Sequence, residues 1–167
     1  MKKVILSVVL FASVIAVSAQ PRAIGGRFTW GVEASYQHEL GSNMIQLDVG
    51  VPYFSSIQAV GTYNWIFPIS SWQHAGSWNW YAGVGAGAGL GWWWYKNVVW
   101  DNSRHNNTKM YGIVGGVGMV GVEYNFKFPL QLSLDYRPLI GVEVSGGDIW
   151  FHDRGLFSVA AGVRYKF

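Results

Sequence analysis

Apolar and polar residues alternate along most of the chain after its first twenty residues. In IQLDVGV (45–51), LQLSLDY (130–136) and the last eleven residues (157–167), every second side chain is apolar, and most of those between are polar or small. Successive side chains of a strand point to opposite faces, whereas an amphipathic helix repeats its apolar residues every three or four positions. The alternation therefore predicts an all-β fold whose strands each have one apolar face.

The alternating pattern divides into eight predicted strands. They are 22–28, 31–39, 44–53, 56–66, 78–95, 109–126, 130–143 and 156–167. The connections at 41–43 and 127–129 are tight, whereas those at 96–108 and 144–154 are long and polar. Short turns at one end and long loops at the other are typical of membrane β-barrels. The first segment alternates least clearly, but bacterial barrels usually have an even number of strands, which favours including it.

The stretch WYAGVGAGAGLGWWWY (80–95) carries glycine at every second position from Gly83 to Gly91. As a strand, it has an apolar face bordered by tryptophans, which is typical of contact with lipid and both interfaces. Its other face is nearly bare backbone, which leaves room for larger side chains inside a narrow barrel. The alternation points Trp93 inward near the mouth, unless a bulge turns it outward. The residues predicted to form the aromatic girdles are Trp78, Trp80, Trp92, Trp94, Tyr136 and Tyr165.

The first twenty residues, MKKVILSVVLFASVIAVSAQ, have the composition of an export signal. Two lysines precede an apolar stretch, and Val17 and Ala19 are small enough for a signal peptidase site. We therefore predict a cleaved signal peptide at 1–19, export through the Sec pathway, and a single barrel domain over 20–167.

The composition differs from that of ordinary soluble proteins. Charged residues make up 13% of the chain and aromatic residues 17%, whereas a soluble domain has about 25% charged residues. No stretch after the export signal is long and apolar enough for a membrane-spanning helix. Two of the 12 basic residues lie in the signal, so the remaining 10 nearly balance the 9 acidic residues, and nucleic acid is not an expected partner. The absence of cysteine excludes disulfides and thiolate metal sites.

Together, the export signal, the WYAGVGAGAGLG strand, the VGVEYNF…PLQLSLDYRP hairpin and the terminal GVRYKF resemble the small outer-membrane β-barrel proteins of the OmpA/OmpX type. This resemblance implies a monomeric, eight-stranded, antiparallel, up-and-down transmembrane β-barrel in the outer membrane of a Gram-negative bacterium. It further implies contact with outer-membrane lipid and lipopolysaccharide. By the same resemblance, Phe167 is the C-terminal signal that the barrel-assembly machinery uses. The resemblance specifies the architecture but not the biochemical role.

Most charged residues within the predicted strands fall on the faces that point into the barrel. An eight-stranded barrel encloses a space that side chains fill, and charges buried there must be paired and hydrogen-bonded. We therefore expect an ion-pair network that plugs the lumen, with an open diffusion channel as the alternative. Its predicted members are Glu33, Asp48, Glu123, Asp135, Arg137, Glu143, Arg164 and Lys166, with Arg27 as a further candidate.

The loops at 96–108 and 144–154 are the predicted sites of interaction with lipid headgroups or with a host or envelope protein. Ordinary interfacial anchoring is the competing interpretation of the aromatic residues in these loops. Those aromatic residues are Trp100, Trp150 and Phe151, and they lie near Arg104 and Arg154.

A lipid-modifying enzyme is a second alternative function. It would use His105 or His152 together with a nearby nucleophile or carboxylate. Short polar loops bring such residues together by chance, so catalytic residues are not expected. The neighbours in the sequence are Asp101, Ser103 and Asp153.

Neither a metal nor a cofactor is expected. No histidine has the local spacing of a metal site. GVGMVG (116–121) matches a dinucleotide motif, but a strand-like segment follows it where a helix is needed. A soluble barrel for an apolar ligand is disfavoured, because its glycine face would be exposed to water.

Overall fold

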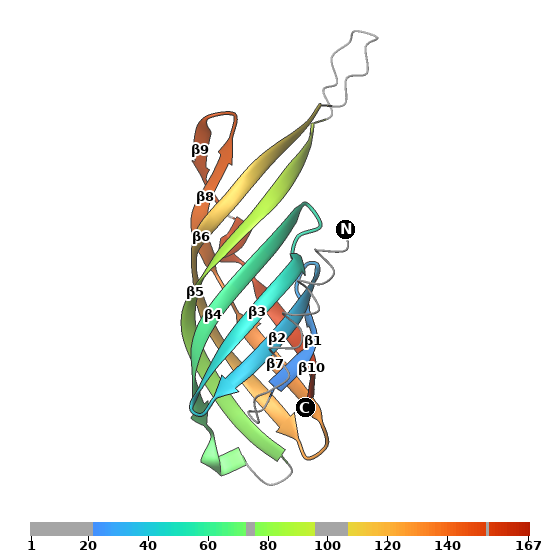
Figure 1. Cartoon of the computed structure of the whole chain (residues 1–167), viewed down its shortest axis with the longest axis vertical. Coiled ribbons are helices and arrows are strands. Elements are labelled where there is room, and N and C mark those ends of the chain that lie inside the picture. The colour runs from blue at the N-terminus through green and yellow to red at the C-terminus, as the bar shows by residue number, and fades with distance from the viewer. Residues whose placement is uncertain (1–21, 73–75, 96–106, 153) are drawn as a thin grey trace, which may run out of the picture.

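The computed structural model describes residues 22–72, 76–95, 107–152 and 154–167, which form a closed, eight-stranded antiparallel barrel (Figure 1). The strand segments are β1 (Arg22–Phe28), β2 (Val32–Leu40), β3 (Asn43–Val51), β4 (Ser56–Pro68), β5 (Gly76–Tyr95), β6 (Asn107–Phe126), β7 (Leu130–Tyr136), β8 (Leu139–Ser145), β9 (Asp148–Phe151) and β10 (Val159–Lys166). Two short 3-10 helices, η2 (Ser70–Trp72) and η3 (Arg154–Leu156), lie in connections. Within the described ranges, no helix is long and apolar enough to cross a membrane. The predicted signal peptide lies outside them.

These segments make eight barrel strands because two of them continue one another. β7 and β8 both pair with β6 in one register, with Val120 opposite Tyr136 and Val117 opposite Leu139. Pro138, which has no backbone N–H to donate, lies at the break between them. β9 pairs with β8 and precedes β10 in the chain. Pairing of β1 with β10 closes the sheet into a barrel.

The eight predicted strands correspond to these eight barrel strands, and the largest difference lies in the predicted loop 144–154. There the chain forms a hairpin, because β8 continues to Ser145 and β9 folds back on it. Gly146 and Gly147 form the turn with φ angles of +61° and +97°, which glycine adopts readily and which a two-residue hairpin turn requires. The last strand begins at Val159 rather than at 156, because η3 precedes it.

The two ends of the barrel are unequal (Figure 1). At one end, which we call the turn end, lie the β2–β3 and β6–β7 turns and the C-terminus. At the other, which we call the loop end, the β5–β6 and β8–β9 hairpins rise well beyond the β1–β2 and β3–β4 turns. The difference follows from strand length, since β5 and β6 have 20 residues each and β2 and β3 have 9 each.

Inward-facing glycines of β5 and β6 accept large side chains from the neighbouring strand. A Cβ atom at Gly91 would overlap the ring of Tyr111, which stands directly opposite on β6. A Cβ atom at Gly121 would lie 2.6 Å from the ring of Tyr81, which stands opposite on β5. The glycine face therefore makes room inside the barrel, as the sequence predicted.

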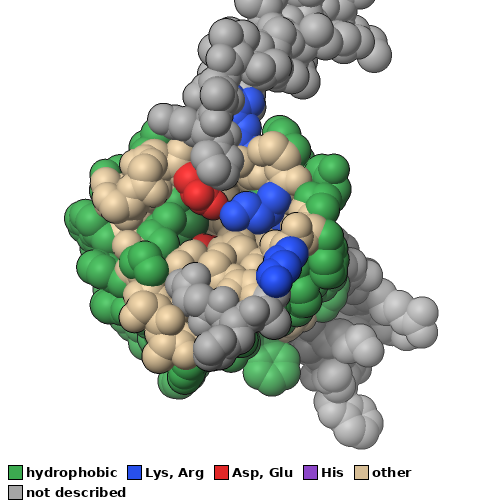
Figure 2. All heavy atoms as spheres, turned by 90° about the horizontal axis from the view of Figure 1, so that it is seen from below, with side chains coloured by type: hydrophobic (Ala, Val, Ile, Leu, Met, Phe, Trp, Pro, Cys, Tyr) green, Lys and Arg blue, Asp and Glu red, His purple; other side chains and the backbone are tan. Residues whose placement is uncertain are grey.

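The distribution of polar and apolar side chains between inside and outside is the reverse of that in a soluble protein. Leu47 on the outer face of β3 is 48% exposed, whereas Glu33 on the inner face of β2 is fully buried. Figure 2 looks at the turn end and shows hydrophobic side chains around the outside, with charged side chains gathered within the ring. The exterior is therefore apolar and much of the interior is charged or polar.

Candidate functional site

Two arginines and three carboxylates form one ion-pair network inside the barrel, here called the central network. Arg27 on β1 reaches Glu33 on β2 and Asp135 on β7, with N–O distances of 2.5 Å each. Arg137, between β7 and β8, reaches Glu33 at 2.6 Å and Asp48 on β3 at 2.5 Å. Glu33 thus accepts from both arginines, one on each carboxylate oxygen. The network joins the β1–β3 side of the barrel to the β7 side.

Neutral side chains complete the hydrogen bonding of the central network. The side-chain amide of Gln46 donates to both oxygens of Asp48, at 3.1 and 2.9 Å, and itself accepts from Gln37 at 2.9 Å. The hydroxyl of Tyr81 donates to Asp135 at 3.5 Å. These donors matter because the network holds three carboxylates and only two guanidinium groups, all buried. Donated hydrogen bonds stabilise buried anions that lack a full counter-charge.

Arg164 lies inside the barrel, but it pairs with no carboxylate of the described residues. Its Nε donates to the hydroxyl of Ser35 at 2.9 Å, and one terminal nitrogen donates to Ser133 at 2.7 Å. Its other terminal nitrogen is buried and has no hydrogen-bond partner among the described atoms. The sequence placed Arg164 in an ion-pair network, whereas the structure surrounds it with hydroxyl groups.

Glu123 is held by amides, and no cation of the described residues pairs with it. Asn79 and Asn125 donate to one of its oxygens at 2.9 and 3.1 Å, and Gln131 donates to the other at 2.7 Å. Lys166 donates to Asn125 at 2.9 Å. This amide cluster is therefore separate from the central network.

Lys166 also pairs with Glu39, with an N–O distance of 3.4 Å. Both side chains are partly exposed, so water screens this ion pair. Glu39 was not among the residues singled out in the sequence.

Glu143 pairs with His152 at the loop end, away from the predicted network. Its carboxylate lies 2.7 Å from His152 Nδ1, and both side chains are nearly buried. The β8–β9 hairpin makes this pair possible, because it brings the end of β9 back beside β8. His152 Nε2 is buried and has no hydrogen-bond partner among the described atoms. The pair therefore anchors the hairpin and does not present a base to solvent.

The other residues considered for an enzyme site are not described. The residues outside the described ranges are Trp100, Asp101, Ser103, His105 and Asp153. The side chains of Arg104 and Arg154 are not described either. In the described part of the chain, no group of three or more His, Asp or Glu side chains could hold a metal ion.

Apolar side chains occupy the lumen beside the charged groups. Val60, Tyr111, Ile113, Val117 and Leu139 form one buried cluster. They come from β4, β6 and β8, the tall side of the barrel. The interior thus combines a charged layer with an apolar layer.

A second apolar cluster packs against the polar groups. It consists of Met44, Tyr81 and Met119, with Ile66 partly buried against it.

In the β3–β4 turn, burial raises the pKa of the Tyr53 hydroxyl above its ordinary value of 10.0.

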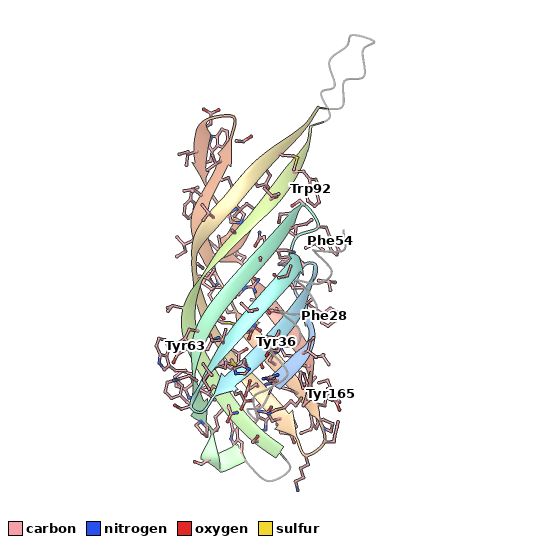
Figure 3. All side chains as sticks on the ribbon, viewed as in Figure 1. Phe28, Tyr36, Phe54, Tyr63, Trp92 and Tyr165 are labelled. Atoms are coloured by element: carbon pink, nitrogen blue, oxygen red, sulfur yellow. The ribbon has the colours of Figure 1, made fainter. Side chains whose placement is uncertain are left out.

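Aromatic side chains collect on the outer surface near the turn end. Phe67 stacks on Trp80 with ring centroids 4.2 Å apart, and Trp78 contacts Tyr124 at 4.8 Å. Tyr165 stacks on Phe167 at 6.5 Å. Figure 3 shows Tyr36, Tyr63 and Tyr165 nearer to the turn end, and Phe54 and Trp92 nearer to the loop end.

The remaining predicted girdle residues have different surroundings. Tyr136 is exposed, and its hydroxyl donates to the carbonyl of Leu156 at 2.8 Å. The side chains of Trp93 and Trp94 are not among those described, so the direction of Trp93 stays a prediction.

The last residue, Phe167, pairs with the first residue described. Its N–H donates to the Arg22 carbonyl at 2.8 Å, and the Arg22 N–H donates back at 3.1 Å. Its ring is exposed on the outside of the barrel.

Comparison with known proteins does not identify a family. No protein-family model matches the chain, and no curated protein matches its sequence.

Proposed function

We propose that this protein is an integral outer-membrane β-barrel with a plugged lumen and a structural or interaction role. The observation that carries the proposal is the inversion of polarity between the two faces of its wall. The outer face exposes large apolar side chains all round, and the inner face buries charged residues. A lipid environment favours this distribution, because hydrocarbon accepts apolar side chains and a closed barrel leaves no backbone edge unpaired.

The central network supports a plugged barrel rather than a diffusion channel. Arg27 and Arg137 bridge carboxylates from strands on both sides of the lumen. An ion path would have to break these buried pairs, and removing a partner from such a pair costs about 3–5 kcal/mol. The apolar cluster around Tyr111 and Leu139 fills further space.

The interaction role belongs to the loop end. There Trp150 is exposed on β9, next to the buried pair of Glu143 and His152. A large exposed aromatic side chain at this end suits contact with lipopolysaccharide or with a host or envelope protein. The connection 96–108 would contribute to the same surface.

The proposed location is the outer membrane of a Gram-negative bacterium. It is supported by the export-signal composition of residues 1–19, together with the barrel itself. The proposed partners in the membrane are lipid, lipopolysaccharide and the barrel-assembly machinery, and the protein is proposed to be a monomer without enzymatic activity.

Fractionation tests the location and the barrel together. The full chain is expressed in a Gram-negative host, and its migration on a detergent gel is compared before and after boiling. We expect it in the outer-membrane fraction, with a folded band that boiling converts to the unfolded mass. A protein that stays soluble after export, or that shows one unfolded band with or without boiling, would refute the proposal.

Conductance distinguishes the plugged barrel from the channel. The purified folded protein is inserted into planar lipid bilayers, and current is recorded at both polarities. We expect silent bilayers, with insertion shown independently by protease protection of the barrel. Regular single-channel steps from inserted protein would favour the diffusion channel instead.

A further inference from the structure

The strands on one side of the barrel have about twice as many residues as those on the other, so the wall is taller there. A transmembrane strand needs about 9–11 residues. The 9 residues of β2 and of β3 match this length, whereas β5 and β6 have 20 residues each. Figure 1 shows the difference as the β5–β6 and β8–β9 hairpins standing above the rest of the loop end. An ordinary membrane barrel would turn polar where its strands leave the bilayer.

The outer face of the tall side stays apolar up to its last described side chains. We name the upper part of this surface the upper apolar face. The pairing register places its members on one side of the sheet, since Gly112 stands opposite both Leu90 and Val144, and Val144 stands opposite Ile149. All are between 42% and 66% exposed. The upper apolar face consists of Leu90, Met110, Val144, Ile149 and Phe151.

The inner face of the same hairpins carries the polar groups. Glu143 and His152 point inward and bond to each other, and Trp150 stands opposite Glu143 on that face. The outer face has no charged member among the described residues of β5, β6, β8 and β9 that point outward. The hairpins are therefore amphipathic, and their apolar side faces away from the barrel axis.

We propose that the upper apolar face is embedded in membrane hydrocarbon, so that the lipid belt of this barrel is taller beside β5, β6 and β8 than beside β1, β2 and β3. The inference rests on the proposed function. Lipid is the expected occupant because the face continues without a break into the apolar middle of the wall, through Val114 and Ile140. A docking site for a protein would be bordered by polar residues.

A lipid belt of unequal height has a physical consequence. The bilayer must thicken beside the tall wall or thin beside the short wall, and each ångström of mismatch costs a fraction of a kcal/mol. The barrel would therefore adopt one preferred orientation relative to the surrounding bilayer.

Spin labels test the proposal directly, because the chain has no native cysteine. Single variants Ile149→Cys and Val144→Cys are labelled with a nitroxide in the full barrel, refolded into dioleoylphosphatidylcholine vesicles. Trp150→Cys, on the inner face of the same hairpin, is the matched control. Leu47→Cys reports the outer face of the short wall, and Ser42→Cys reports water at a turn. Each label's relaxation by oxygen, which concentrates in lipid, is compared with its relaxation by a water-soluble nickel chelate.

We expect oxygen to dominate at 144, 149 and 47, and the nickel chelate to dominate at 150 and 42. If 47 favours oxygen while 144 and 149 favour nickel, the tall lipid belt is refuted and the membrane barrel stands. If 47 also favours nickel, the proposed function itself fails. Spin–spin broadening at 149 would show a second copy on this face and would overturn the proposal as well. Relaxation data are interpreted only for labelled variants that show heat-modifiable migration. Phe151→Cys replaces a variant that does not fold.

Discussion

The ring of Tyr81 on β5 lies against Gly121 on β6, at a distance where the glycine could carry no side chain without moving the ring. The same relationship recurs in the opposite direction higher in the hairpin, where Tyr111 on β6 covers Gly91 on β5. Each tyrosine extends over the strand beside it and fills the lumen there. Gly91 and Gly121 of this hairpin are therefore packing sites for aromatic rings.

Gly121→Ala is expected to destabilise the barrel by about 1–3 kcal/mol, the usual cost of overpacking a filled interior. The new Cβ would lie 2.6 Å from the Tyr81 ring and 2.8 Å from the Cβ of Asp135. Equilibrium unfolding in urea, followed by tryptophan fluorescence in vesicles, measures the change. The matched control is Gly116→Ala on the same strand, where nothing lies within 4 Å of the added atom. Equal effects of the two substitutions would contradict the packing role.

Arg137→Met is expected to cost about 3–5 kcal/mol, because it leaves Glu33 and Asp48 buried without that counter-charge. The same unfolding measurement applies. Lys166→Met is the control, since its ion pair with Glu39 is 25% and 22% exposed and such pairs contribute about 0–1 kcal/mol. A loss of stability no larger for Arg137→Met than for Lys166→Met would show that the central network is dispensable.

Leu134→Lys is expected to destabilise the folded barrel in vesicles by about 2–4 kcal/mol, the cost of a lysine on the lipid face near the bilayer midplane. Leu134 is 55% exposed and lies on β7, between neighbours on β6 and β10. Phe128→Lys in the β6–β7 turn is expected to cost about 0–1 kcal/mol, because the turn reaches the interface. A protein that tolerates Leu134→Lys and becomes more soluble in the absence of detergent would argue for an aqueous barrel.

Glu143→Ala is expected to loosen the β8–β9 hairpin while leaving the barrel folded. The substitution removes the partner of His152 Nδ1, which anchors the end of β9. Hydrogen exchange should accelerate at residues 148–152 and stay unchanged at Arg27 and Glu33. Glu143→Gln keeps an acceptor for the imidazole and should exchange more slowly than Glu143→Ala. Unchanged protection in both variants would mean that the hairpin is held by its backbone pairing alone.

The alternating pattern predicted the strands and the two faces of the wall well, because both depend on local periodicity. It placed Leu47 outside and Glu33 inside, each from its position within its own strand. The hairpin at 144–154 was missed, although its two adjacent glycines signal a two-residue turn. Polar composition and the glycines made the segment resemble a loop, and only pairing with β8 makes β9 a strand.

The pairing of charges could not be predicted from the sequence in the same way. Arg27 contacts Asp135 across 108 positions of the chain, and Arg137 contacts Glu33 across 104. Such contacts depend on the register of every strand around the barrel, which no local pattern contains. For the same reason Glu143 was assigned to the lumen network, whereas the hairpin brings it to His152. Arg27, which the sequence left as a further candidate, is a full member of the central network.

The long-range ion pairs of Arg27 and Arg137 have a consequence for the order of assembly. The first three strands bring together one arginine and two carboxylates, and the second arginine arrives only with the seventh barrel strand. Until that strand arrives Asp48 has no arginine partner, and a partly built sheet that entered lipid would carry this unpaired carboxylate into hydrocarbon, at a cost of several kcal/mol. The nascent sheet must therefore keep its concave side hydrated until the last strands arrive. We therefore expect closure of the barrel and loss of interior water to occur together, late in assembly.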